Sequence, residues 1–183
     1  MRLFVALDFP LSLRKALAPL FREKIPGAKW TSPEQLHLTL RFLGECPDET
    51  FEALRSGLRE IAAPSFPLAL QGVGTFPNPQ RPRVLWAGLE AGPELYALQN
   101  QVEALAQALG LPPETKAFSP HLTLARLKFP APAETARFLM KFHGLRSPAF
   151  QVEEFHLYSS RLSPKAAEHR KEASFPLRQG SSS

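Results

Sequence analysis

The chain has 183 residues, of which 44% are hydrophobic, so it is long enough to bury a core as one domain or as two small lobes. Its 22 Lys and Arg residues outnumber 17 Asp and Glu, and the resulting net charge of +5 favours an anionic partner such as nucleic acid. The single cysteine, Cys46, excludes an intrachain disulfide and a cysteine-based zinc cage, and no apolar run approaches the roughly 20 residues that cross a bilayer.

Residues 2–8 predict an opening strand, because this stretch is rich in apolar residues that alternate along it. Asp8 interrupts the stretch close to the N-terminus, so it lacks the apolar core of a secretory signal peptide. Together with the single cysteine, this indicates a cytoplasmic protein. Pro10 then suits the first position of a helix.

The rest of the chain predicts short helices and strands, joined by connections that are rich in proline. The spacing of apolar residues predicts helices near 10–21, 48–61, 93–109 and 133–143. Apolar runs predict strands at 36–43, 66–73, 83–89, 120–127, 149–160 and 169–178, and a loop or short strand around Trp30. This order indicates an α+β fold of two lobes, each with an antiparallel sheet and flanking helices, and a cleft between them. We expect residues 1–178 to form one bilobal unit and residues 179–183 to form a disordered polar tail.

The tetrapeptide His-Leu-Thr-Leu occurs twice, at residues 37–40 and at residues 121–124. Successive side chains of a strand point to opposite faces, so the His and Thr of each copy share one face and the leucines share the other. Each copy therefore offers an imidazole and a hydroxyl side by side on a strand that buried leucines anchor. A lone histidine is more often a surface or core residue, but packing gives no reason to repeat the same pair.

The side chains of His37, Thr39, His121 and Thr123 suit metal-free chemistry on a phosphate. Histidine titrates near neutral pH, so one imidazole can act as the acid while the other acts as the base. The two threonines can donate to the non-bridging oxygens while phosphorus is five-coordinate. No carboxylate lies within either motif to complete a site of two histidines and an acid, which argues against a metal hydrolase.

The paired His-x-Thr-x motifs resemble the signature of the two-histidine phosphoesterase superfamily. The chain is similar to the bacterial and archaeal branch of that superfamily, the RNA 2',3'-cyclic phosphodiesterases, also called 2'-5' RNA ligases. The resemblance extends to about residue 178, and the segments that carry it are 2–8, 37–45, 76–79, 83–89, 120–126 and 157–162. The motif positions show no departure from the family pattern.

The resemblance implies pseudo-symmetric sheets, with both histidines facing a central cleft. It also implies metal-independent opening of a 2',3'-cyclic phosphate at an RNA 3' end, without a cofactor, to give a 2'-phosphomonoester. RNA joining through a 2'-5' bond is a related activity, in which a 5'-hydroxyl replaces water. By this likeness His37 is the proton donor and His121 the proton acceptor. The implied partner is RNA with a cyclic phosphate end, tRNA fragments included, and we expect the protein to be a monomer.

Two arginines and two aromatic residues are further candidates for substrate contacts. Arg41 stands four residues after His37, so strand parity places it on the catalytic face, where it could hold phosphate. Arg126 stands five residues after His121 and would point away from that face in a regular strand. The family pattern nevertheless favours Arg126 as a substrate contact, which requires the strand to end or bulge near Ala125. The aromatic candidates, Phe4 and Tyr158, could stack on a base, with core packing as the alternative.

Two other functions stay open. The motifs address only the phosphate, so the substrate could instead be a small cyclic nucleotide phosphate or a 2'-5' oligonucleotide. A non-catalytic RNA-binding module would use the basic cleft, but it gives no reason for two intact His-x-Thr pairs. The remaining histidines lack a threonine two residues later and are interpreted as structural or surface residues: His143, His156 and His169. Arg81 and Arg83 are either RNA backbone contacts or charges on a solvated loop.

Overall fold

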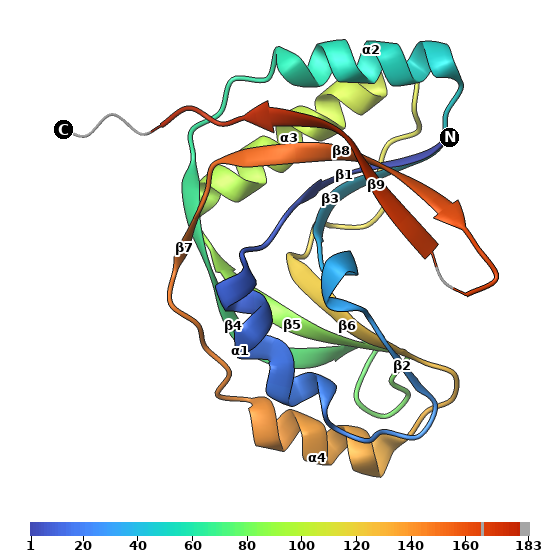
Figure 1. The fold of residues 1–183 in the computed structure, drawn as a ribbon, viewed down its shortest axis with the longest axis vertical. Helices are drawn as coiled ribbons and strands as arrows, with labels where there is room; N and C mark the ends of the chain where they lie inside the picture. The colour runs from blue at the N-terminus through green and yellow to red at the C-terminus, as the bar shows by residue number, and fades with distance from the viewer. Residues whose placement is uncertain (166, 180–183) are drawn as a thin grey trace.

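Two antiparallel β-sheets form the framework of the protein, which we describe over residues 1–165 and 167–179 in a computed structural model (Figure 1). The four-stranded sheet has the order β3 (Leu38–Glu45), β1 (Arg2–Leu7), β8 (Glu154–Leu162) and β9 (Ala167–Pro176). The five-stranded sheet has the order β2 (Ala28–Trp30), β6 (His121–Leu127), β5 (Val84–Ala91), β4 (Phe66–Phe76) and β7 (Phe150–Val152). The predicted α+β class with two antiparallel sheets is confirmed. The predicted tail at 179–183 falls, apart from Gln179, outside the described residues.

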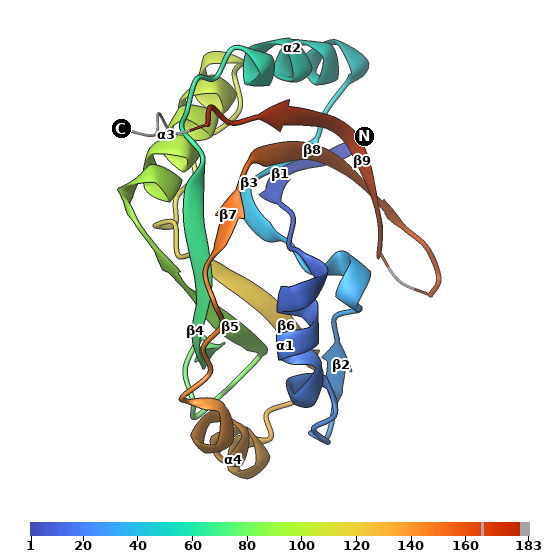
Figure 2. The ribbon, with the colours of Figure 1, turned by 60° about the vertical axis from the view of Figure 1, so that its left-hand side comes forward.

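Helices flank both sheets within the described ranges, at positions close to the predicted ones: α1 (Leu11–Phe21), α2 (Asp48–Arg59), α3 (Pro93–Ala108) and α4 (Pro132–Phe142). Helices α2 and α3 lie side by side next to the four-stranded sheet, whereas α1 and α4 lie next to the five-stranded sheet (Figures 1 and 2). Acidic residues in the first turn of α2 and Arg59 in its last turn match the helix dipole. None of the helices in the described part of the chain is long and apolar enough to cross a membrane.

The predicted strand over 149–160 is wrong as a single element, because the chain passes from one sheet to the other at Glu153. Strand β7 pairs with β4, whereas β8 pairs with β1 and β9. Val152 and Phe155 are buried, and the two glutamates between them are exposed. This exposed pair interrupts the alternation of buried and exposed residues that a continuous strand would keep.

Strand β1 is covered on both faces, and its residues 3–7 are all buried. Alternate side chains of β1 join the main hydrophobic core, while Phe4 and Ala6 on its other face form a separate cluster with Tyr158 of β8. The four-stranded sheet therefore carries a small aromatic floor on the face opposite the main core.

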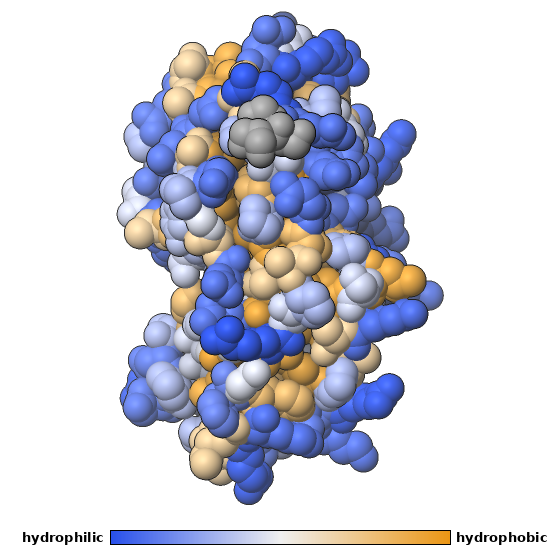
Figure 3. Space-filling view, turned by 90° about the vertical axis from the view of Figure 1, so that its left-hand side faces the viewer, coloured by the Kyte–Doolittle hydropathy of each residue, from blue (hydrophilic) through white to orange (hydrophobic). Residues whose placement is uncertain are grey.

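One outer face of the molecule shows apolar side chains in the middle and hydrophilic side chains around them (Figure 3).

Both motif strands contain a β-bulge at the same place. The register of β3 with β1 skips Leu40, and the register of β6 with β5 skips Leu124, which is in each case the third residue after the motif histidine. A bulge adds one residue to a strand and shifts the alternation of its side chains. The residue five positions after each histidine therefore returns to the face of the histidine. These residues are Phe42 and Arg126.

Candidate active site

A cavity of about 810 Å3 lies where the two motif strands approach each other. His37, the residue before β3, and Thr39 of β3 line it on one side, and His121 and Thr123 line it from the start of β6. All four side chains are partly buried. Further lining residues are Phe42, Phe76, Arg83, Lys116, Phe118 and Arg126. The structure thus brings both His-x-Thr pairs to one hollow, although they lie on different sheets.

His121 is held in one orientation by the backbone. Its Nδ1 atom lies 2.7 Å from the carbonyl oxygen of Ser119, two residues earlier. A carbonyl oxygen only accepts hydrogen bonds, so Nδ1 carries the hydrogen and Nε2 keeps a lone pair when the ring is neutral. The edge of the ring packs against Phe76, with 4.9 Å between the ring centroids. This arrangement leaves Nε2 of His121 as a proton acceptor.

His37 has a more apolar setting than His121. Its ring rests on Tyr158, with 4.5 Å between the ring centroids. Burial lowers the pKa of His37 to about 4, and the nearby Asp8 carboxylate opposes this effect, while the cationic side chains of Arg14 and Lys171 add to it. His37 is therefore neutral at pH 7 in the free protein. An anion in the cavity would favour its protonated form, because opposite charges attract strongly in a partly buried site.

Arg41 does not lie on the catalytic face, where strand parity predicts it. The bulge at Leu40 places Arg41 opposite Val5, on the side of the main core, and its side chain is 9% exposed. Arg41 borders the cavity, but its guanidinium donates to the Glu103 carboxylate and to the backbone carbonyl oxygens of Pro112 and of its neighbour in the chain. Arg41 thus anchors the loop that follows α3, instead of offering free hydrogen-bond donors to a phosphate.

Arg126 occupies the place that the bulge gives it. Its side chain is exposed and lines the cavity, and it forms no ion pair with a carboxylate of the described residues. The two predictions about this residue, from strand regularity and from the family pattern, disagreed. The bulge next to Ala125 settles the placement in favour of the cavity face.

The predicted base-stacking role of Phe4 and Tyr158 is corrected by their burial. They are 4% and 3% exposed, and their rings stack on each other with 5.1 Å between centroids. They form the floor beneath His37 and do not line the cavity. Phe42 is an aromatic cavity residue that the sequence analysis did not identify. It is 64% exposed and lines the cavity, and its ring centroid lies 5.9 Å from that of Phe4. Only the bulge, which has no clear signal in the sequence, brings Phe42 to this face.

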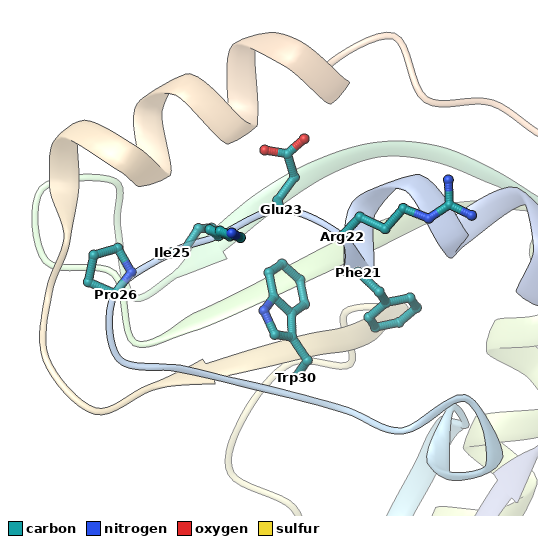
Figure 4. Close-up of a pocket in the computed structure, with 7 residues that line it drawn as sticks. Phe21, Arg22, Glu23, Ile25, Pro26 and Trp30 are labelled. Carbon is teal, nitrogen blue, oxygen red and sulfur yellow. The ribbon is translucent and has the colours of Figure 1, made fainter.

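A second hollow, of about 510 Å3, lies at the end of α1 near Trp30 and is drawn in Figure 4. Its lining residues include Phe21, Glu23 and Ile25, and none of the predicted site residues lies there. Glu23 is paired with Lys141 of α4. Within residues 1–165 and 167–179, no group of three or more His, Cys, Asp or Glu side chains is placed to hold a metal ion.

The fold and the two facing His-x-Thr pairs define a phosphoesterase of the two-histidine class. A family model described as LigT like Phosphoesterase matches residues 9–86 and 89–167. The RNA 2',3'-cyclic phosphodiesterase of Archaeoglobus fulgidus is 38% identical over 167 residues, which span 90% of this chain and 94% of the relative. The protein of the same name from Thermus thermophilus is 40% identical over 188 residues, which span 97% and 91%. The chain belongs to the LigT-like phosphoesterase family.

Solved structures give the same result. A crystal structure of a Thermus thermophilus protein superposes with a TM-score of 0.80 at 36% identity and covers 98% of this chain and 99% of its own. The LigT protein of E. coli, solved in complex with 3'-AMP, superposes with a TM-score of 0.77 at 26% identity and covers 96% and 97%. The family assignment therefore rests on sequence and on fold together.

Proposed function

We propose that this protein opens 2',3'-cyclic phosphates at RNA 3' ends and leaves a 2'-phosphate, with His121 as the base and His37 as the acid. The observation that carries the proposal is the pairing of two His-x-Thr units across one cavity, with a different environment for each imidazole. The names of the curated relatives, RNA 2',3'-cyclic phosphodiesterases, support this substrate.

His121 begins the reaction. Its Nε2 lone pair takes a proton from water as the water oxygen attacks phosphorus. The bond between Nδ1–H and the Ser119 carbonyl holds the ring in the required tautomer and supports the positive charge that develops on it. If the 5'-hydroxyl of a second RNA replaces water, the same proton transfer forms a 2'-5' linkage. The cyclic ester is already activated, so neither reaction needs ATP.

His37 completes the reaction. The bound phosphate is an anion, so it opposes the effect of burial and favours the protonated imidazole. The protonated His37 then gives its Nε2 proton to the 3' oxygen as the P–O3' bond breaks. The phosphate remains on the 2' oxygen. Thr39 and Thr123 donate to the non-bridging oxygens, and Arg126 neutralises the charge that builds up there.

A row of cations favours an RNA chain over a small cyclic nucleotide. Lys29 lies opposite Arg126 in the β2–β6 pair, so both side chains share one face. Lys128 follows two residues later, and Arg83 donates to the Lys128 carbonyl oxygen at 3.3 Å. We call these four residues the cationic strip. All are exposed, and none pairs with a carboxylate in the part of the chain that the structure describes.

The strip extends outside the cavity, because Arg126 and Arg83 line the cavity whereas Lys29 and Lys128 do not. Successive phosphates of a single strand can follow such a row, whereas a mononucleotide reaches only its first members. Phe42, exposed at the cavity, offers a face on which the terminal base can stack.

The test is to incubate the protein, with a chelator present, with a short RNA that ends in a 2',3'-cyclic phosphate. We expect a 2'-phosphate product from the wild type and from His143→Ala, an exposed histidine outside the cavity, and at least a hundredfold slower reaction from His37→Ala and His121→Ala. A 3'-phosphate product would show that the P–O2' bond breaks instead of the P–O3' bond and would contradict the proposed direction of ring opening. No turnover of this RNA by the wild type would refute the proposed function.

A further inference from the structure

The two catalytic histidines differ at the nitrogen that faces away from the chemistry. Nδ1 of His121 is bonded to the carbonyl oxygen of Ser119, two residues earlier. Nδ1 of His37 is buried and has no hydrogen-bond partner within the described ranges. The residue two positions before it, Gln35, uses its side chain to donate to the carbonyl oxygen of Ala167 in β9. The backbone contact that orients His121 is therefore not repeated at His37.

This difference matters because His37 has to become an imidazolium. A protonated imidazole has two N–H donors, and a buried donor without an acceptor costs about 1 to 3 kcal/mol. One N–H is used on the departing oxygen. The other, on Nδ1, needs an acceptor on the buried side of the ring.

A third histidine lies next to the ring of His37. The ring of His169, on β9, is 5.5 Å from the ring of His37 between centroids, and it meets the edge of Phe4 at 4.9 Å. Nδ1 of His169 is also buried, and it too lacks a hydrogen-bond partner in the described part of the chain. The two neighbouring rings thus each hold one unused, buried nitrogen.

The separation of the rings permits a hydrogen bond. An imidazole nitrogen lies a little over 1 Å from the centre of its ring, so rings 5.5 Å apart leave about 3.2 Å between nitrogens that face each other. That distance is at the upper end of the normal range for a hydrogen bond. The hydrogen bond requires the two rings to turn so that these nitrogens face each other.

We propose that His169 is a positioning residue for His37, whose Nδ1–H it accepts on its own Nδ1 when His37 is protonated. The bond leaves Nε2–H of His37 directed at the departing 3' oxygen. His169 itself touches neither substrate nor the reacting atoms. The inference rests on the proposed role of His37 as the acid, but the pairing of the rings can be measured without any substrate.

The charges around the two rings allow at most one of them to become an imidazolium. Burial lowers the pKa of His169 as it lowers that of His37, and a charge on either ring opposes a charge on the other. Asp8, at the end of β1, favours a proton on His37, whereas Arg14 from α1 and Lys171 from β9 oppose it. Lys171 and Arg14 also contact the Asp8 carboxylate, at 2.9 and 3.4 Å, so their effects partly cancel. These charges therefore favour a pair with one imidazolium and one neutral imidazole over a pair of two cations.

The remaining neighbour of His37 that titrates is Tyr158 of β8, whose pKa burial raises far above neutrality. Tyr158 therefore stays neutral at pH 7 and does not change the charge around His37. His169 differs from Tyr158 in that it holds a buried nitrogen without a hydrogen-bond partner in the described part of the chain, and its lowered pKa favours the neutral ring that can accept.

The experiment compares His169→Phe, which keeps a ring without an acceptor, with His169→Gln, whose amide oxygen can accept. The pKa and the tautomer of His37 are read from its 15N–1H imidazole correlations by NMR, and kcat is measured on the cyclic-phosphate RNA. We expect His169→Phe to lower the pKa of His37 by about one unit and kcat by about tenfold, and His169→Gln to retain both. His143→Phe, an exposed control, should match the wild type.

The direction in which the pKa of His37 changes in His169→Phe tests the proposal. If His169 acts on His37 only through charge repulsion, its removal raises the pKa of His37, and the proposal is overturned. An unchanged pKa, or a His169→Gln variant as impaired as His169→Phe, overturns it as well. A wild type that turns over no RNA refutes the proposed function but leaves the NMR result to decide the pairing. Thermal unfolding midpoints confirm that each variant is folded.

Discussion

His37 and His121 share the same neighbours in sequence but have different surroundings in the fold. His121 is held by a carbonyl oxygen and packs edge-on against Phe76, whereas His37 lies on the aromatic floor of Phe4 and Tyr158. The first setting fixes a tautomer with an available lone pair, and the second makes protonation depend on a bound anion. The two imidazoles therefore suit opposite roles, His121 as a proton acceptor and His37 as a proton donor.

Phe42 gives a prediction at the scale of one residue. If the terminal base stacks on this ring, Phe42→Ala should reduce kcat/KM about 5- to 150-fold on RNA with a normal 3'-terminal base, because base–aromatic stacking contributes about 1 to 3 kcal/mol. Phe42→Trp should retain the rate. On an RNA whose 3'-terminal ribose carries no base, Phe42→Ala and the wild type should react equally. Met140→Ala, an exposed apolar control on α4, should change neither rate. An equal loss on both RNAs would show that Phe42 does not contact the base.

At the scale of the element, the matching bulges in β3 and β6 decide which side chains reach the cavity. Each bulge sends the fourth residue after the histidine towards the core and the fifth towards the cavity. Arg41 becomes an anchor for the loop after α3, and Arg126 becomes a cavity residue. The same irregularity in the backbone thus has opposite consequences for two arginines.

This contrast predicts that substitution of Arg126 lowers activity, whereas substitution of Arg41 lowers stability. Arg126→Ala should lower kcat/KM about ten- to a hundredfold with an unchanged thermal midpoint, because a charge-assisted contact to phosphate is lost at an exposed site. Arg41→Ala leaves the Glu103 carboxylate without its cation and should destabilise the fold by about 3 kcal/mol, as the loss of one partner of a buried ion pair does. Calorimetry and steady-state kinetics on both variants check the two effects. Equal stability losses would contradict the assignment.

Much of this could be predicted from the sequence, because periodicity is a local property. The ranges of the helices, the strand character of both motifs and the shared face of His37 and Thr39 follow from the spacing of side chains. The bulges could not be predicted without the family pattern, since register depends on the partner strand. The break at Glu153 had a visible signal, two successive charged residues inside an apolar strand, that the prediction did not use. The closeness of His169 to His37 is a contact between distant strands, which no local pattern reveals.

The cationic strip gives a prediction about the element β2 and its neighbours. The double variant Lys29→Ala, Lys128→Ala should weaken RNA turnover and make the dependence of log(kcat/KM) on log[salt] less steep by about 1.4, or about 0.7 for each lost contact to a single strand. Turnover of a mononucleotide 2',3'-cyclic phosphate should not change. The matched control, Lys15→Ala with Arg59→Ala, removes two exposed cations on α1 and α2. If both double variants lose the same RNA turnover and the same salt dependence, the effect comes from net charge and not from the cationic strip.

At the scale of the whole molecule, one chain supplies both halves of the site. Thr39 lies in the four-stranded sheet with His37 directly before its strand, and the five-stranded sheet carries His121, Thr123 and Arg126. The chain crosses between the sheets before His37, where the Thr31 amide donates to the Leu124 carbonyl oxygen at 2.8 Å, and again at Glu153. A monomer therefore holds all the proposed catalytic groups, and the monomeric state stays a prediction.

The buried histidines predict how stability depends on pH. In the unfolded chain His37 takes up a proton near pH 6.5, but in the folded protein burial delays this to about pH 4. The unfolded state thus binds more protons between these values, so the free energy of unfolding should fall as pH falls from about 6.5 to about 4. His156 and His169, whose pKa values burial also lowers, act in the same direction. Denaturant unfolding at pH 7, 6 and 5 measures this slope, and His37→Gln should make it shallower. A slope of the wild type that does not change in His37→Gln would contradict the buried, neutral state of His37.

The central claim is that His37 acts as the acid and His121 as the base on one phosphate. It is tested most directly with an RNA whose terminal cyclic phosphate has sulfur in place of the 3' oxygen, because a thiolate leaves without being protonated. We predict that His37→Ala opens this substrate within about tenfold of the wild-type rate, although it loses about 10²- to 10⁴-fold on the oxygen substrate. His121→Ala should be impaired on both. A His37→Ala variant that is equally slow on both substrates, or a sulfur substrate that rescues His121→Ala instead, would contradict the assignment.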